Sequence, residues 1–262
     1  MEHIGRIVPN SASSCSLQSN PKSRVDAYNQ SSGNLRGYDC KDCKNRGYFA
    51  VLDGQYEKLR PCKCLETRKM LRRMEQSGLQ DVLCDCTFDK FIAESPWQSQ
   101  AKQMAQAYAK HPDGRWFFAG GQVGCGKTHL CTAIVGELLR RGIAAKYMLW
   151  RDDSVHLKSI VTDHAAYRKE MGALKDAPAL YIDDFFKTER GKLPSTAEIN
   201  LAFELLNYRY NKKALITVIS SEHTMDGIIK MDEAVGSRIY ERARGCCVIV
   251  RPDIQKNYRL KR

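Results

Sequence analysis

The sequence lacks long hydrophobic runs. No apolar stretch in the 262 residues approaches the roughly 18 residues that a membrane-spanning helix needs, and the N-terminus has no apolar segment of the signal-peptide type. We therefore expect a cytoplasmic protein with no membrane partner. Large apolar residues are also scarce over residues 1–37, which are rich in Ser, Asn and Gln. Such a segment buries too little surface to offset the entropy of ordering it, so we expect it to be disordered.

Acidic residues are fewer than basic ones. Lys and Arg total 42 against 30 Asp and Glu, which gives a net charge of +12. Hydrophobic residues make up 43% of the chain, enough for a substantial core. The excess of positive charge favours an anionic partner, nucleic acid first, although a basic surface can also serve only to keep a protein solvated.

A phosphate-binding loop is the strongest motif. Residues 116–131 read WFFAGGQVGCGKTHLC, which is an apolar strand, a glycine-rich turn and the start of a helix. Residues 121–128 match G-x-x-x-x-G-K-[ST], in which backbone N–H groups surround phosphates at the positive end of a helix. Lys127 would reach the β- and γ-phosphates of ATP, and the Thr128 hydroxyl would ligate Mg²⁺. The residues expected to contact ATP are Gly121, Gln122, Val123, Gly124, Cys125, Gly126, Lys127, Thr128 and His129.

Two adjacent acids end a later apolar strand. Residues 179–182 are mostly apolar and lead into Asp183 and Asp184. In a nucleotide-binding α/β domain, such a strand places one carboxylate on Mg²⁺ and the next near the attacking water. We assign Asp183 to the metal and Asp184 to the water. The pattern alone would be weak evidence, but its position one β-α unit after the loop favours this assignment.

The remaining periodicity alternates between strands and helices. Strands are expected at residues 144–150, 214–219 and 246–250, and helices at residues 155–171, 195–210 and 233–244. Ser195 and Glu198 form a capping-box pattern at the start of one helix. Ser220 and Ser221 follow a strand, where a hydroxyl could bond the γ-phosphate or its water. We assign Ser221 to the nucleotide, although serine is also an ordinary strand terminator.

Four cysteines predict a zinc ribbon. Cys40 and Cys43 form C-x-x-C, and Cys62 and Cys64 form C-x-C beyond a hairpin pattern with an Asp-Gly turn. Disulfides are rare in the cytoplasm, so the eleven cysteines direct attention first to metal. Four thiolates at the ends of a hairpin would hold zinc tetrahedrally, and a module this small would need the metal to fold. The alternative is four unrelated thiols. A competing C-x-C at residues 84–86 has no second pair beside it.

These motifs occur in an order that resembles a known family. A cysteine ribbon, a basic helix at residues 65–79, a connector at residues 88–91 and G-x-x-G-x-G-K-T together resemble the DnaC/DnaI-type replicative helicase loaders. A polar helix is also expected at residues 96–110, between the connector and the phosphate loop. The helicase loaders are AAA+ ATPases of the IstB-like ATP-binding family, and the resemblance covers roughly residues 38–250. It implies an α/β P-loop fold with a five-stranded parallel sheet, ATP and Mg²⁺. It also implies an N-terminal module that docks on a hexameric helicase, and a core that binds single-stranded DNA and assembles with neighbouring subunits.

The resemblance further implies an arginine finger donated across a subunit interface. Arg238 stands at the family's position, and Arg242 or Arg244 could share the role. An arginine there would stabilise charge on the phosphoryl group of a neighbour's ATP. The alternative is an arginine on the helix surface.

Two features depart from the family pattern. The polar strand end is usually Ser-Asn, whereas here it is Ser220-Ser221. Few residues follow Val250, and they are mostly basic, which predicts a core without the C-terminal helical lid of a full AAA+ module. We expect such a site to be open and to hydrolyse ATP slowly unless a neighbour or partner completes it. The basic tail could hold a phosphate backbone.

The expected organisation is a disordered segment at 1–37, a zinc ribbon with a basic helix at 38–79, a linker and helix at 80–112, and an AAA+ ATPase domain at 113–262. The expected function is ATP-dependent loading of a hexameric replicative helicase onto single-stranded DNA during replication initiation. Two alternatives remain open. One is a transposition helper that recruits a transposase to target DNA, a group that usually lacks the cysteine ribbon. The other is a zinc- and DNA-binding protein that keeps ATP as a structural ligand.

Overall fold

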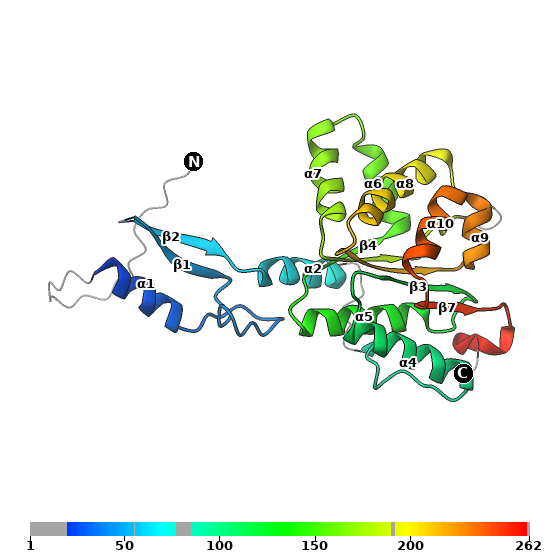
Figure 1. Cartoon of the computed structure of the whole chain (residues 1–262), viewed down its shortest axis with the longest axis horizontal. Coiled ribbons are helices and arrows are strands. Elements are labelled where there is room, and N and C mark those ends of the chain that lie inside the picture. Colours follow the sequence, from blue (N-terminus) through cyan, green and yellow to red (C-terminus); the bar gives the residue numbers. More distant parts are fainter. Residues whose placement is uncertain (1–19, 55, 77–84, 190–191, 261–262) are drawn as a thin grey trace. The chain divides into compact units, whose positions relative to one another are not determined.

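The computed structural model describes residues 20–54, 56–76, 85–189 and 192–260 (Figure 1). The chain divides into two compact units, Met1–Cys62 and Lys63–Arg262, each with its own secondary structure. Within the described residues, no helix combines the length and the apolar character needed to cross a membrane. Residues 77–79, which end the expected basic helix, and Cys84 lie outside the described residues.

The smaller unit is built on a hairpin. Strands β1 (Tyr48–Asp53) and β2 (Tyr56–Pro61) pair antiparallel, with Asp53 opposite Tyr56 across the turn. Gly54 adopts the left-handed φ of +66° that such a tight turn needs. The hairpin expected from the sequence is therefore present.

The structure differs from the expected disorder of residues 1–37 at Pro21–Gln30, which forms helix α1. Asn20 caps the helix by accepting a hydrogen bond from the Lys22 N–H at 3.1 Å. The Asn29 amide donates to the Ala50 carbonyl at 2.8 Å and accepts from the Ala50 N–H at 3.0 Å. Composition missed this helix because polar side-chain bonds to the hairpin, rather than a large apolar face, hold it there.

The larger unit contains a five-stranded parallel sheet, as the sequence predicted. The order across it is β4-β5-β6-β3-β7. The strands are β3 (Trp116–Gly121), β4 (Ala145–Leu149), β5 (Ala179–Asp183), β6 (Ile216–Ser221) and β7 (Cys247–Val250). Side chains alternate between the two faces: Phe117 joins one buried cluster, while Trp116 and Phe118 join the other. Both faces are therefore covered, as a parallel sheet requires.

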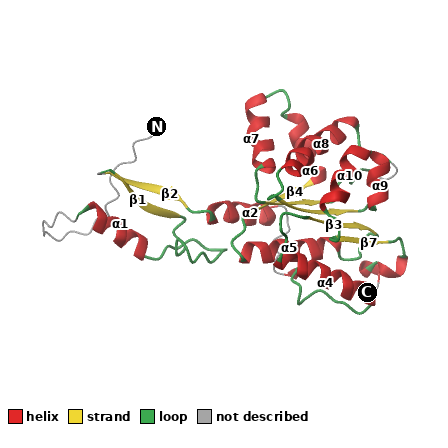
Figure 2. Cartoon of the chain, in the orientation of Figure 1, coloured by secondary structure: helices red, strands yellow, loops and turns green. Residues whose placement is uncertain are grey.

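Helices form the two outer layers (Figure 2). One layer contains α4 (Pro96–Lys110) and α5 (Lys127–Arg140). The other contains α6 (Trp150–Ser159), α7 (His164–Lys175), α8 (Thr196–Asn211), α9 (Met225–Met231) and α10 (Glu233–Arg242). Helix α2 (Cys64–Gln76) packs beside β4. Phe88 and Phe91, expected in a linker, are buried in the same cluster as α4 and α5.

The single helix expected at residues 155–171 is two helices. Helix α6 ends at Ser159, and Asp163 caps α7 by accepting hydrogen bonds from the Ala165 and Ala166 N–H groups. The apolar spacing continues through the break, which is why periodicity alone joined the two. By contrast, the capping box of Ser195 and Glu198 starts α8 as predicted.

The buried side chain of Arg209 ties α8 to the sheet. Its guanidinium, which has no exposed surface, donates five hydrogen bonds. The acceptors are Thr217 Oγ1 and the carbonyls of Leu174, Lys175, Ala177 and Ile216. Burial lowers the pKa of Arg209 to about 9.

Replacing Arg209 with leucine is expected to lower the free energy of unfolding by about 3 kcal/mol or more, because several buried carbonyls lose their donors. Urea denaturation measures the change. Arg168→Leu, at an exposed position of α7, is the control and should change stability by no more than about 0.5 kcal/mol. Equal effects of the two substitutions would contradict the role given to Arg209.

Candidate functional site

The glycine-rich loop between β3 and α5 borders a cavity of about 500 Å³. Gly121, Gly124 and Gly126 all have left-handed φ values, between +72° and +105°. At Gly121 a Cβ atom would lie 2.0 Å from the Val250 carbonyl oxygen, so only glycine fits there. Gly126 is the N-cap of α5, which directs the free N–H groups of the helix start at the cavity. The local backbone therefore suits an anion.

Lys127 supplies a cation at this helix start. Its side chain is nearly buried, and Nζ donates to the carbonyl oxygens of Gly121 at 2.9 Å and Gln122 at 2.7 Å. The ammonium group therefore lies folded back onto its own loop, beside the cavity that it lines. A phosphate oxygen would be a stronger acceptor for this group than a carbonyl.

Asp183 ends β5 beside the loop, and side chains from three other elements meet its carboxylate. Thr128 Oγ1 of α5 donates to Oδ1 at 3.3 Å, and the Tyr147 hydroxyl of β4 donates to Oδ2 at 3.2 Å. The Ser220 hydroxyl of β6 also donates to Oδ1. Thr128 and Asp183 thus present a hydroxyl and a carboxylate to the same point, which is a donor set that suits Mg²⁺. Burial and the Asp183 charge raise the pKa of Tyr147, so its hydroxyl remains a proton donor.

Asp184 faces the same cavity and is held by a neighbouring lysine. Its backbone has a left-handed φ of +51°, uncommon for a residue with a side chain. Lys187 Nζ lies 2.8 Å from Asp184 Oδ2 and 3.0 Å from Glu222 Oε1. Burial alone would lower the pKa of Lys187, but its bonds to these two carboxylates raise it overall. Lys187 and Glu222 line the cavity and were not singled out from the sequence, because their pairing joins two separate strand ends.

The two serines that end β6 make different contacts. Ser220 reaches Asp183, while Ser221 is fully buried and donates to the Phe185 carbonyl at 2.7 Å. The Ser221 oxygen also accepts from the His223 N–H at 3.1 Å. Ser221 does not line the cavity, and Glu222 does. The assignment of Ser221 to the nucleotide stays a prediction.

The loop residues differ in how they face the cavity. Its lining includes Val123, Gly124, Gly126, Lys127, Thr128 and His129. Gln122 turns away, and its Oε1 accepts from the Asp253 N–H at 2.8 Å. Cys125 is buried, and that burial raises its pKa. The contacts predicted for Gln122 and Cys125 would therefore come from the backbone.

The segment before α4 (residues 86–92, which include the connector) closes another side of the cavity. The His129 ring lies against Phe91 with centroids 5.3 Å apart, and its Nε2 is 2.8 Å from the Thr87 carbonyl oxygen. Cys86 and Ile92 also line the cavity. Burial raises the pKa of the Cys86 thiol to about 11, with a further contribution from the Asp85 charge, so the free thiol stays protonated at neutral pH.

Arg238 lies on α10 and does not line the cavity. Its Nε donates to Asn207 Oδ1 at 3.0 Å, and its guanidinium stacks 4.8 Å from the centre of the Phe203 ring. Arg242 instead supports the fold: it donates to the Tyr210 carbonyl at 2.7 Å, and its guanidinium lies 5.4 Å from the centre of the Trp116 ring. An action of Arg238 on ATP would therefore have to be on the ATP of another subunit.

The cysteines of the predicted ribbon converge. The sulfur atoms of Cys40, Cys43, Cys62 and Cys64 all lie within 4.8 Å of one another, and all four residues are buried. Cys40 Sγ and Cys62 Sγ are 3.8 Å apart. That matches the edge of a tetrahedron of sulfurs around zinc, about 3.8 Å for Zn–S bonds of about 2.3 Å. The four residues therefore fit zinc.

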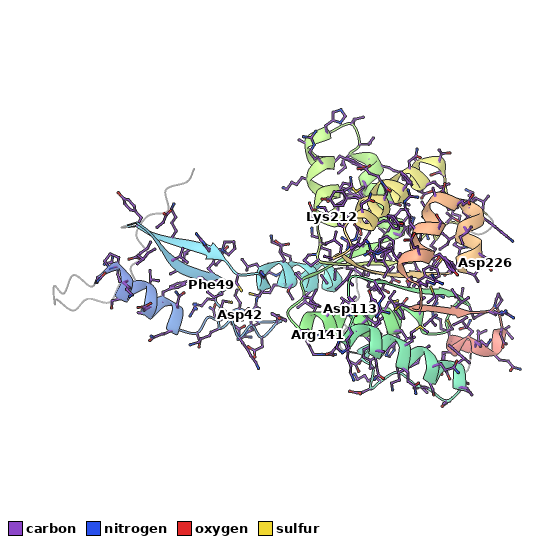
Figure 3. All side chains as sticks on the ribbon, viewed as in Figure 1. Asp42, Phe49, Asp113, Arg141, Lys212 and Asp226 are labelled. Atoms are coloured by element: carbon purple, nitrogen blue, oxygen red, sulfur yellow. The ribbon has the colours of Figure 1, made fainter. Side chains whose placement is uncertain are left out.

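The backbone after Cys43 supports this arrangement. Lys44, Asn45 and Gly47 have left-handed φ values, which fold the chain back over the sulfur. The Gly47 N–H donates to Cys43 Sγ at 3.2 Å, and Asn45 Oδ1 accepts from the Cys40 N–H at 2.9 Å. Figure 3 labels Asp42, which lies between the first two cysteines.

Comparisons with known proteins point to a family of ATP-binding proteins. A family model described as IstB-like ATP binding protein matches residues 60–262. The phage-like element PBSX protein XkdC of Bacillus subtilis (strain 168) is 32% identical, over 86% of this chain and 87% of that protein. The replicative helicase loader DnaC of Escherichia coli (strain K12) is 25% identical, over 67% of this chain and 70% of that protein.

Solved structures show the same fold in the larger unit. The crystal structure of the DnaC helicase loader superposes with a TM-score of 0.54 at 18% identity, covering 64% of this chain and 98% of that one. The crystal structure of DnaI gives a TM-score of 0.53 at 20% identity, covering 66% of this chain and 93% of that one. At these identities the likeness extends to the fold alone.

Proposed function

Since the chain belongs to the IstB-like ATP-binding protein family, we propose that it is an ATP-dependent loader that places a hexameric replicative helicase on single-stranded DNA. The observation that carries the proposal is the meeting of Lys127, Thr128 and Asp184 at one cavity. Directly behind them, the Asp183 carboxylate accepts hydrogen bonds from the Thr128 hydroxyl and the Asp184 N–H. The similarity to a protein named as a replicative helicase loader supports the finer assignment.

In the proposed reaction, each side chain acts on a different part of the nucleotide. Lys127 would exchange its two carbonyl acceptors for the β- and γ-phosphate oxygens. Thr128 and Asp183 would hold Mg²⁺, which supplies charge neutralisation of the phosphates. Asp184 would orient the attacking water, with Lys187 fixing its carboxylate through Oδ2 and leaving Oδ1 to face the water.

Two other functions compete with helicase loading. A transposition helper would share the ATP site, but the zinc-binding geometry of the four cysteines favours the loader, because such helpers usually lack that ribbon. A protein with ATP as a structural ligand would need no second acid at the cavity. The presence of Asp184 there, paired with Lys187, favours hydrolysis.

Binding of the full chain to the cognate hexameric helicase tests the proposal. In size-exclusion chromatography with ATP, the wild-type chain is expected to elute with the helicase and to deliver it to circular single-stranded DNA. Lys127→Ala, which should lose ATP, is the matched variant and should fail to deliver. A chain that never associates with the helicase, with or without ATP, contradicts the proposal.

Mixing variants tests the trans role proposed for Arg238. Arg238→Ala should bind a fluorescent ATP analogue as wild type does, because the residue lies outside the cavity, yet hydrolysis in the assembly should fall at least tenfold. Adding Lys127→Ala subunits, which keep Arg238, should restore part of the rate. Arg168→Ala is the control. Failure of the mixture to recover, with both variants folded, would exclude the trans role.

A further inference from the structure

The segment after β7 (residues 253–260) lies against the phosphate loop. Two short 3₁₀ turns, Ile254–Lys256 and Tyr258–Leu260, form most of it. The sequence predicted only a basic tail there. In the structure, the loop and this C-terminal segment are joined at successive points, although more than a hundred residues separate them along the chain.

The first contacts fix the beginning of the loop, at Gln122. The Gln122 N–H donates to the Val250 carbonyl at 2.9 Å, and the Asp253 N–H donates to Gln122 Oε1 at 2.8 Å. The Val250 carbonyl and the Asp253 N–H therefore both bond to Gln122. Val250 is also the residue against which Gly121 packs. The beginning of the segment therefore holds the beginning of the loop.

The next contacts cover the middle of the loop. The Tyr258 N–H donates to the Gly124 carbonyl at 3.0 Å. A Cβ atom on Gly124 would lie 2.0 Å from Asn257 Oδ1, so the segment and the loop backbone are in close contact. The Tyr258 hydroxyl donates to the Ile92 carbonyl at 3.3 Å and accepts from the Gln98 amide. Tyr258 therefore joins the loop to the connector on the other side of the cavity.

The segment also brings a cation to the cavity. Arg259 lines it together with Tyr258, Lys127 and Thr128. Lys187 is paired with two carboxylates and Lys90 with Asp85. Within the described residues, the Arg259 guanidinium has no hydrogen-bond or ion-pair partner. A guanidinium beside a phosphate-binding loop is complementary to a phosphate group, because its positive charge and paired N–H donors suit two phosphate oxygens.

We propose that residues 253–260 are part of the nucleotide site, with Arg259 binding a phosphate of the nucleotide. This inference rests on ATP being the ligand of the cavity, as in the proposed function. Nucleotide binding then fixes the segment in place, because Arg259 is anchored through Tyr258 to Gly124 and Ile92. The segment would then have two roles: its backbone holds the phosphate loop in place, and Arg259 contacts the nucleotide in the cavity.

Equilibrium binding of a fluorescent ATP analogue to the full chain tests the contact. Arg259→Gln should weaken binding about tenfold, the typical effect of one charge-assisted hydrogen bond, and Arg259→Lys should recover part of the loss. Arg251→Gln is the control, since Arg251 is exposed and does not line the cavity. Binding unchanged by Arg259→Gln, or weakened equally by Arg251→Gln, would overturn the proposal.

Trypsin cleavage after Lys256, followed by mass spectrometry, gives a second readout that does not depend on activity. ATP should slow this cleavage several-fold in wild type and leave it unchanged in Lys127→Ala. Equal cleavage of wild type with and without ATP would overturn the coupling. If Lys127→Ala loses ATP and Arg259→Gln binds it as wild type does, residues 253–260 are not part of the site, but the cavity is still an ATP site. If the wild-type chain binds no ATP, both the proposed ATP site and the role of residues 253–260 in it are wrong.

Discussion

Lys127→Ala is expected to weaken ATP binding by at least about 100-fold, which corresponds to about 2.7 kcal/mol. The ammonium group is the nearly buried cation at the start of α5 and donates to carbonyls of the loop that would surround the phosphates. Alanine at this position removes the positive charge that would neutralise the β- and γ-phosphates of bound ATP. Titration with a fluorescent ATP analogue measures the loss.

The fold itself should tolerate this substitution, because Lys127 bonds only carbonyls of its own loop. Thermal unfolding separates the two effects. ATP at 100 times its dissociation constant should stabilise wild type by about 2.7 kcal/mol and should leave Lys127→Ala unchanged. Lys110→Ala, at the exposed end of α4, is the control and should behave as wild type. ATP stabilisation that survives in Lys127→Ala would contradict the site.

Cys43→Ser is expected to release zinc and unfold the smaller unit. Cys43 is fully buried, and its sulfur is one of four that together fit a tetrahedral zinc ion. Structural zinc contributes about 10–16 kcal/mol to the folding of small metal-binding modules, more than the small apolar core of the hairpin could replace. Metal analysis should find about one zinc ion per wild-type chain and a small fraction of that in the variant.

Limited proteolysis should show residues 20–62 cleaved rapidly in Cys43→Ser and in wild type treated with a chelator. Cys246→Ser is the matched control, since Cys246 is also buried but belongs to the core of the larger unit. It should keep its zinc. A Cys43→Ser chain that retains full zinc, or a chelated chain that resists protease as before, would show that the four cysteines do not form a structural site.

Local signals in the sequence predicted the parts of the fold that depend on neighbouring residues. The glycines of the phosphate loop, the apolar run into Asp183 and the capping box at Ser195 each specify a turn or an end of an element. The five-stranded parallel sheet, which the resemblance to the helicase loaders implied, is confirmed. The four cysteines were found for the same reason, because each pair is local in sequence.

The remaining features depend on contacts between distant segments. Lys187 meets Glu222 only because β5 and β6 are neighbours in the sheet, and Arg259 reaches the cavity only because β7 pairs with β3. Helix α1 is held by Asn29 bonding to a strand that follows it. Spacing along a single chain carries no signal for such pairs, so these residues could not have been assigned from the sequence.

The rate of ATP hydrolysis with and without partners tests the central claim most directly. Arg238 lies outside the cavity of its own chain, so the finger role proposed for it would need a neighbouring subunit. The purified chain should hydrolyse ATP slowly, and adding both single-stranded DNA and the hexameric helicase should raise the rate at least tenfold, with no rise in Lys127→Ala. A high rate in the isolated chain that neither partner changes would contradict an ATP-dependent loader.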